Sequence, residues 1–418
     1  MTKHTFRHAL LLTLSFALCG AAARAQEEQK ITTPPWGDAA AKIHFGAEDQ
    51  GTLQLQYKAQ FRATYRDIGS GTDGADSTTN FGFRRNRLAV MGAWSDKVSL
   101  YVQGEFADPN LAAIDFSGAG FDTSFQLLDA AVRFSFSDAL KVNVGRFKYN
   151  FSRENLEACE DPLTLDRSLF LRASYVGTRD DGVAVWGNLL KDKVQYRVDA
   201  MEGRQAAAGA VAPASNPRFS ARAHVTLLDP ESAYGYKGTY LGRKKVLTVG
   251  GAVQYESKVA YTDVDTQLGR HDYRAYTADA FFEYPLSKAG TVNASAAWEK
   301  IDLDGAYKGA NPDLGATGLN GEKNGWYAKA GYLLPGAPLQ FFGRYEKWRF
   351  ACLSNAYDQI VDWVGVGANY YVWGQNLKLT AEFSKTDFDK EGTFTNLQGT
   401  GRTTKDFNQF VLQMQFIF

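Results

Sequence analysis

Six arginines stand at positions that would face water on strands of alternating residue type, where their guanidinium groups could bind anions. They are Arg62, Arg66, Arg85, Arg87, Arg133 and Arg222. A guanidinium can hold two oxygens of a phosphate or carboxylate at once. Residues an even number apart lie on the same face of an extended strand. We therefore expect the first five on one face of neighbouring strands, forming a basic path for anions that Arg222 could extend.

A second interpretation of these arginines is structural. They could pair with Glu105, Asp129 or Glu299 and only stabilise a wet wall. The sequence leaves both interpretations open.

The elements that carry these arginines are predicted to be strands. From Leu53 to Arg66, apolar and aromatic residues alternate with polar ones over 14 residues, which is a strand period and not a helix period. Sixteen such strands are expected, at residues 53–66, 81–93, 98–106, 129–136, 140–149, 181–189, 193–200, 219–227, 245–256, 273–285, 290–301, 325–334, 338–348, 359–372, 376–386 and 409–418.

The links between these strands alternate in length. Short ones such as 94–97 and 137–138 alternate with long polar ones such as 107–122 and 257–272. Outer-membrane barrels have short periplasmic turns and longer external loops, so the pattern predicts an all-β transmembrane antiparallel barrel. The link at 229–244 breaks this alternation, because a short turn is expected there.

Aromatic residues near predicted strand ends favour the barrel over a soluble all-β sandwich. Trp348, Trp363, Tyr370, Tyr371 and Trp373 are expected to form an interfacial girdle. Arg84 has the parity of the apolar Leu88, so it is expected near a membrane interface, where its long side chain can reach water.

The chain begins with features of a secretory signal peptide at residues 1–25. A basic start and an apolar run precede Ala23-Arg24-Ala25, which fits the cleavage rule. Residues 26–50 are expected to be a short periplasmic segment and 51–418 the barrel. Without the signal peptide the chain has 43 basic and 46 acidic residues, which does not suggest a nucleic-acid partner. The expected location is the bacterial outer membrane, with its lipid as a partner.

The last strand has aromatic or apolar residues at every second position. They are Phe410, Leu412, Met414, Phe416 and Phe418. This face is expected to meet lipid, the glutamines between to meet a wet lumen, and the strand to pair with the first strand. The pattern resembles the signal read by the barrel-assembly machinery.

Four segments resemble the phosphate-selective porin O and P family. They are Phe83–Leu88 (FRRNRL), Gly145–Glu154 (GRFKYNFSRE), Leu165–Leu169 (LDRSL) and Gly238–Lys245 (GTYLGRKK). The resemblance implies a homotrimeric porin of 16 strands that passes anions, phosphate especially. It also implies an extended link near 229–244 and a third external loop, about 150–180, that folds inward and constricts the pore.

The proposed constriction loop carries charges of both signs. Its candidate residues are Lys148, Arg153, Glu157, Glu160, Asp166, Arg167 and Arg172. The carboxylates, with Glu154 and Asp161, argue against phosphate selectivity unless Arg153, Arg167 and Arg172 neutralise them. Asn150 also departs from the family pattern, which has proline there.

Enzymatic chemistry finds little support in the sequence. It contains no G-x-S-x-G, H-E-x-x-H or P-loop motif, and His271 with Asp263, Asp265 and Asp272 is expected to be a solvated loop. Cys159 and Cys352 match no metal or haem spacing, so no catalytic residue, metal or cofactor is expected. Both cysteines fall on expected external loops, and whether they pair is left open.

Three functions remain open. The first is passive diffusion of small anions such as phosphate. The second is a general or cation-preferring solute porin, which the acidic loop favours. The third is a structural barrel that sheathes a partner protein.

Overall fold

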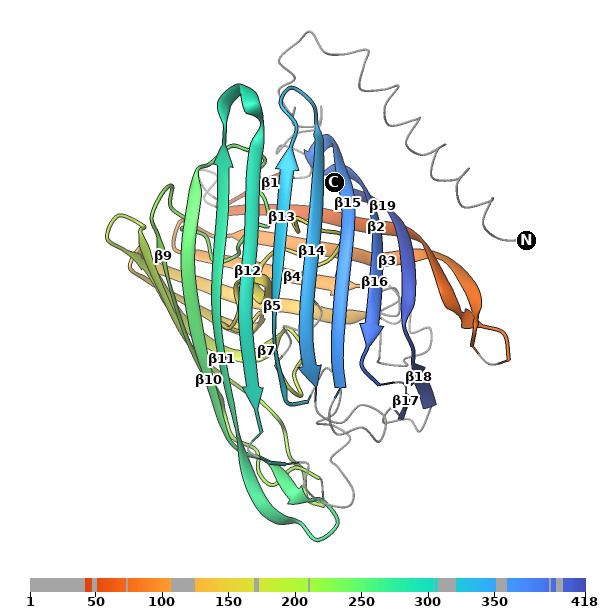
Figure 1. Cartoon of the computed structure of the whole chain (residues 1–418). Helices are drawn as coiled ribbons and strands as arrows, with labels where there is room; N and C mark the ends of the chain where they lie inside the picture. The colour runs from red at the N-terminus through yellow and green to blue at the C-terminus, as the bar shows by residue number, and fades with distance from the viewer. Residues whose placement is uncertain are drawn as a thin grey trace, which may run out of the picture.

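The computed structural model describes residues 42–46, 51–72, 74–106, 125–168, 173–209, 211–303, 305–306, 321–350, 359–390, 392–395 and 401–418. The signal peptide expected at residues 1–25 lies outside this part of the chain. Among the described residues, sixteen strands form a closed antiparallel β-barrel (Figure 1), as predicted from the sequence.

The barrel strands are β2 (Gly51–Ser70), β3 (Asp76–Ala93), β4 (Val98–Glu105), β5 (Gln126–Ser137), β6 (Leu140–Phe147), β7 (Asp180–Leu189), β8 (Val194–Met201), β9 (Arg218–Thr226), β10 (Val246–Asp263), β11 (Leu268–Pro285), β12 (Thr291–Asp302), β13 (Lys323–Leu333), β14 (Leu339–Phe350), β15 (Gln359–Gln375), β16 (Leu377–Phe388) and β19 (Phe407–Ile417). Short elements accompany them: β1 (Lys42–Phe45), which pairs with the start of β2, the helices α2 (Arg153–Leu156) and η3 (Ser287–Ala289), and the hairpin of β17 (Gly392–Thr395) and β18 (Gly401–Thr404).

The barrel closes where the last strand meets the first. β19 pairs with β2 from Gln409 opposite Arg66 to Ile417 opposite Lys58. Beyond this ladder, the backbones of Phe418 and Tyr57 exchange two hydrogen bonds of 2.9 and 2.8 Å. Closure satisfies the backbone groups at what would be two open sheet edges, which a lipid environment requires.

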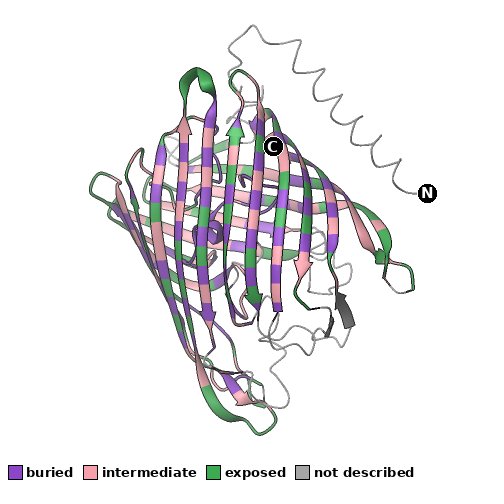
Figure 2. Cartoon of the chain, viewed as in Figure 1, coloured by how far each residue is buried: buried purple, intermediate pink, exposed green. Residues whose placement is uncertain are grey.

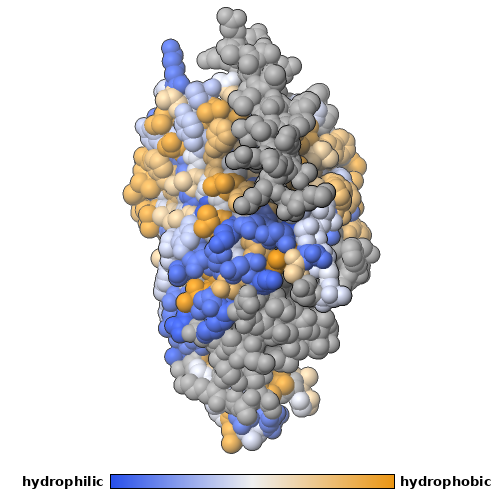
Figure 3. Space-filling model, turned by 45° about the vertical axis from the view of Figure 1, so that its right-hand side comes forward, coloured by the Kyte–Doolittle hydropathy of each residue, from blue (hydrophilic) through white to orange (hydrophobic). Residues whose placement is uncertain are grey.

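The two faces of the strands differ as the alternation predicts. On β19, Leu412, Met414 and Phe418 are exposed on the outer face, while Gln413 and Gln415 are buried inside. Figure 2 shows this alternation as stripes along the strands. Figure 3 shows apolar side chains gathered over the upper half of the visible wall and hydrophilic ones below them.

The expected aromatic girdle is wrong for three of its residues. Trp348, Trp363 and Tyr371 are fully buried in the barrel interior. They share parity with inward residues of β14 and β15, and parity, not position along the strand, decides which way a side chain points. Tyr370 has the other parity and is exposed, as a girdle residue should be.

Short turns lie at the end of the barrel that also holds Phe418, shown at the top in Figure 1. At the opposite end the predicted loop 257–272 is mostly strand, because β10 and β11 extend into a long hairpin. Backbone pairing does not require an apolar face once the strands leave the membrane. The link between β9 and β10, residues 227–245, is long as the sequence indicated.

No helix among the described residues is both long and apolar enough to cross a membrane.

Candidate functional site

The chain between β6 and β7, residues 148–179, contacts widely separated strands of the barrel wall; we call it the β6–β7 segment. On one side, the Arg153 N–H donates to Asp279 of β11 at 3.1 Å. On the other, the Leu165 N–H donates to Glu382 of β16 at 3.1 Å. Next to the first contact, Ser152 caps the single turn of α2 by accepting a hydrogen bond from the Asn155 N–H.

An apolar cluster also holds this segment against the wall. Tyr149, Phe151 and Ala173 of the segment pack with Tyr273 of β11 and Ile301 of β12, and all five are fully buried. Inward positions in the wall of an outer-membrane barrel are ordinarily polar. The cluster therefore fixes one side of the segment by burial of apolar surface.

Arginines of the first two barrel strands bind the other side of the segment through one carboxylate. Asp166 lies 2.7 Å from Arg62 Nη1 and 3.1 Å from Arg85 Nη2, and all three side chains are buried. Burial alone would raise the pKa of Asp166, but these cations outweigh it and hold the pKa well below its usual range. Asp166 is therefore ionised at any physiological pH.

Arg84 joins the same cluster, which corrects the expectation that it faces a membrane interface. Its Nε lies 3.7 Å from the Asp166 carboxylate. The cause is a β-bulge: Gln60 pairs with Arg85 but Phe61 pairs with Phe83, which leaves Arg84 as the extra residue. The bulge also reverses the parity of β3 at this point.

Glu160 is a second carboxylate of the segment that wall cations bind. It lies 3.3 Å from Arg87 Nη1 and 3.8 Å from Lys58 Nζ, and Arg87 also pairs with Glu105 at 2.7 Å. Burial would raise the pKa of Glu160, but Lys58 and Arg87 lower it far below its usual value. Arg87 therefore makes the expected ion pair with Glu105 and a second ion pair with Glu160 of the segment.

Of the three arginines expected to neutralise the segment's acids, Arg153 and Arg167 make no ion pair with them among the described residues. Arg153 pairs with Glu231 outside the segment, and Arg167 donates to the carbonyls of Glu154, Asn155 and Glu157 at 2.7–3.3 Å. Arg172 lies outside the described residues. The partners come from the wall instead, as with Lys329, whose ammonium binds Glu154.

Glu157 differs from Glu154, Glu160 and Asp166 because no cation of the described residues makes an ion pair with its carboxylate. Its backbone forms a parallel bridge to Tyr236 of the β9–β10 link. Burial, and then the nearby Glu154, raise the pKa of Glu157 to about 8. This side chain is therefore mostly neutral at pH 7.

The β9–β10 link (residues 227–245) reaches into the interior and holds a stack of alternating rings and guanidinium groups. From β7 to β11 the order is Trp186, Arg133, Tyr234, Arg197, Tyr236, Arg153 and Phe281, with 4.0–5.6 Å from each guanidinium carbon to its ring centroids. Such contacts contribute about 0.5–2 kcal/mol each. The stack joins the wall, the link and the β6–β7 segment.

A cavity of about 420 Å³ lies between strands β2–β6, the β6–β7 segment and the β9–β10 link. Five cations line it: Lys58, Arg87, Arg133, Lys148 and Arg179. Two carboxylates, Asp129 and Glu160, accompany them, and Arg179 pairs with Asp129 at 3.0 Å. The lining therefore has more positive than negative charge.

Two of these cations have no carboxylate partner within the described part of the chain. Arg133 donates to Asn143 at 3.1 Å, and Lys148 donates to the Glu157 carbonyl at 2.5 Å. Desolvation, and then the nearby Arg167, lower the pKa of Lys148 to about 7. Lys58 was not among the predicted site residues, although it shares strand parity with Gln56 and Gln60 and parity could have identified it.

The remaining predicted site residues lie apart from this cavity. Arg66 donates to Gln409 at 2.6 Å and stacks on Phe407. Arg222 binds Asp279 at 2.6 Å on the far side of the β6–β7 segment, so it does not adjoin Arg62 and Arg85.

Cys159 is a buried free thiol at the edge of the cavity. Burial would raise its pKa, but Arg167, Lys148 and further cations lower it well below the usual value. Cys352 lies outside the described residues, so the question of a disulfide between the two cysteines stays open.

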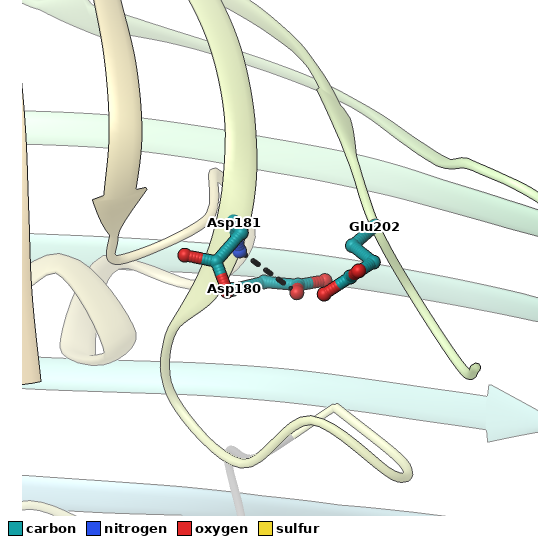
Figure 4. A group of neighbouring side chains, drawn as sticks. All are labelled: Asp180, Asp181 and Glu202. Atoms are coloured by element: carbon teal, nitrogen blue, oxygen red, sulfur yellow. Dashed lines mark hydrogen bonds between the residues drawn. The ribbon is translucent and has the colours of Figure 1, made fainter.

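A group of three carboxylates lies elsewhere, at the ends of β7 and β8 (Figure 4). Asp180, Asp181 and Glu202 have ligand atoms within 4.8 Å of one another. Asp180 accepts hydrogen bonds from the N–H groups of Asp181 and Gly203, and Asp181 pairs with Arg146 at 2.7 Å. These contacts account for two of the three groups, and the cluster by itself does not define a metal site.

Comparison with known proteins identifies a family and solved structures of similar fold. A family model described as phosphate-selective porin O and P matches residues 55–418. An uncharacterized protein of Aquifex aeolicus is 21% identical over 424 residues, covering 94% of this chain and 93% of that protein.

Two solved structures have a similar fold. An anion-selective porin from Comamonas acidovorans has a TM-score of 0.55 and 12% identity, covering 88% of this chain and 100% of that one. The trimer form of OmpT, an outer membrane protein of Vibrio cholerae, has a TM-score of 0.51 and 14% identity, covering 88% and 99%.

Proposed function

Because the chain belongs to the phosphate-selective porin O and P family, we propose that this outer-membrane porin conducts small anions, phosphate among them, past the cavity beside the β6–β7 segment. The observation that carries the proposal is the charge of the cavity lining, five cations against two carboxylates. Anion pores use Arg and Lys at the narrow part of their path, and cation pores use Asp and Glu.

The acids of the β6–β7 segment no longer argue against anions. Asp166 is bound by Arg62, Arg84 and Arg85, so its charge is neutralised within that cluster. Glu154 binds Lys329. A carboxylate that is already paired contributes little repulsion to a passing anion.

We propose that the anion path runs along Arg62, Arg85, Arg87 and Arg133, and that the β6–β7 segment constricts it. Arg133 contributes most to this path. Two aromatic rings and the Asn143 amide hold its guanidinium, and no carboxylate of the described residues pairs with it. The hydrogen bonds of the segment to Asp279 of β11 and to Glu382 of β16 support the constriction.

Two further parts of the proposal concern assembly. We infer a homotrimer, which the trimer form of the similar Vibrio cholerae protein supports. We also infer that the apolar face Phe410–Phe418 is read by the barrel-assembly machinery and then meets lipid, which its exposure supports.

The reversal potential of the purified porin in a planar bilayer, under a tenfold KCl gradient, tests the anion path. We expect a reversal potential whose sign shows that chloride permeates more readily than potassium. Arg133→Gln should lower the anion-to-cation permeability ratio about threefold. The matched control is Arg274→Gln on the exposed outer face of β11, where the Asp272 pair is solvated, and it should leave the ratio unchanged. A wild-type pore that prefers potassium would refute the proposal in favour of the cation-preferring porin.

A further inference from the structure

The cavity beside the β6–β7 segment has two kinds of wall. One carries the cations described above. The other is apolar and consists of Met91, Phe147, Leu156 and the rings of Tyr101 and Tyr234. A path selected only for hydrated inorganic ions would gain nothing from this second wall, because apolar surface attracts only apolar surface.

The cationic wall can bind one or two carboxylates. Arg87, Arg179 and Lys58 are engaged by Glu160 or Asp129. Arg133 and Lys148 make no ion pair with any described carboxylate. Each is nonetheless held in position, Arg133 by Trp186, Tyr234 and Asn143, and Lys148 by a carbonyl. Preorganised cations of this kind bind an anion at a low entropic cost.

The apolar wall lies in the same enclosure as these two cations. Phe147 and Leu156 are almost fully buried, and Tyr234 packs against Trp186 with 5.1 Å between ring centroids. Sites for small organic molecules are mostly apolar, contain a few fixed polar groups and have volumes of roughly 300–1,000 Å³. A cavity of about 420 Å³ falls within that range.

We propose that this cavity is a binding site for amphipathic organic anions, small carboxylates with an aromatic or aliphatic body. The carboxylate binds Arg133 and Lys148, and the body lies against Met91, Leu156 and Tyr234. This inference rests on the proposed anion path and adds the class of solute that the path retains best.

Isothermal titration calorimetry of the full-length porin in detergent tests the inference with four probes: benzoate, acetate, benzamide and inorganic phosphate. Benzoate should bind at least about tenfold more tightly than acetate, because the ring buries apolar surface. The affinity for benzoate should exceed the affinity for benzamide by a similar factor, because benzamide has the ring but not the charge. Benzoate should also bind more tightly than inorganic phosphate.

Variants assign the binding to the two walls. Arg133→Gln should weaken benzoate and acetate alike, and Met91→Gln should weaken benzoate much more than acetate. Arg274→Gln on the outer face is the matched control and should change neither. Should a variant fail to fold, the comparison of the four probes on the wild-type porin still decides the matter.

The outcomes separate this inference from the proposed function. If benzoate, acetate and phosphate bind within twofold of one another while the reversal potential still shows anion preference, the organic-anion site is refuted and the anion porin stands. If benzamide binds as well as benzoate, the charge plays no part and the site is refuted as well. A potassium-selective pore would overturn both.

Discussion

Replacing Asp166 by Asn should release the β6–β7 segment from the first barrel strands. In the native chain this carboxylate lies 2.7 Å from Arg62 and 3.1 Å from Arg85, and its side chain is 1% exposed. The asparagine keeps the shape but leaves the buried guanidinium groups without their anion. Removal of one partner from a buried ion pair costs about 3–5 kcal/mol.

Hydrogen exchange of the segment measures this loss. The Leu165 N–H, which donates to Glu382 at 3.1 Å, is a convenient reporter. If local opening governs its exchange, about 3 kcal/mol corresponds to an exchange rate roughly a hundredfold faster. The assay is mass spectrometry of peptides covering residues 160–168 in the detergent-solubilised porin. Added phosphate should slow exchange in the variant, since it can replace the missing carboxylate among the arginines.

Two comparisons make the result specific. Asp181→Asn removes a pair with Arg146 that is half exposed, which should cost below about 1 kcal/mol and leave the segment unchanged. Arg62→Gln combined with Asp166→Asn should be less damaging than the sum of the single changes, because the two groups interact directly. Exchange in Asp166→Asn within threefold of wild type would refute the idea that this carboxylate anchors the segment.

Three other changes have expected outcomes. Anion preference, measured as reversal potential, should fall as pH rises from 6 to 9. Over this range Lys148, with a pKa of about 7, loses its positive charge, and Glu157, with a pKa of about 8, gains a negative charge. The double variant Lys148→Arg with Glu157→Gln should abolish this pH dependence. Tyr236→Leu should destabilise the β9–β10 link by about 3 kcal/mol, because it removes ring contacts and hydrogen-bond partners of buried arginines, and proteolysis of the folded porin would then cleave within 229–244. Met414→Arg on the lipid face should lower barrel stability by about 2–4 kcal/mol and Met414→Leu by under about 1 kcal/mol, as measured by urea unfolding in lipid vesicles.

The alternation of residue types was sufficient to predict the barrel. Each strand needs an apolar face toward lipid, so period two persists along the chain, and Leu412 and Met414 lie outside as predicted. The pairing of the last strand with the first also followed, since a closed barrel leaves no edge. These are properties of single strands and their order, which a sequence records directly.

The interior was harder to predict because its contacts join distant parts of the chain. Gln413 and Gln415 point inward as expected, but they bind Arg62, Gln60 and the Glu160 carbonyl rather than a wet lumen. The partner of each loop carboxylate depends on where the β6–β7 segment crosses the barrel. No spacing of residues encodes that crossing.

The position of Arg84 shows a different limit. Parity counted along β3 places Arg84 outside, but one bulged residue shifts the register and turns its side chain toward Asp166. A bulge depends on how two strands pair, so the sequence of one strand alone does not indicate it. The six-residue motif from Phe83 to Leu88 indicated the family without revealing this geometry.

The hydrogen bonds between Phe418 and Tyr57 have a consequence for the order of events in folding. They join residues that are more than 350 positions apart, so closure must wait until the whole chain has reached the membrane. Until then β2 and β16 each expose an unpaired edge, and such long-range pairing is slow because the chain loses much entropy when its ends meet. A truncated or delayed C-terminus would therefore leave an open sheet whose two edges invite pairing with other chains.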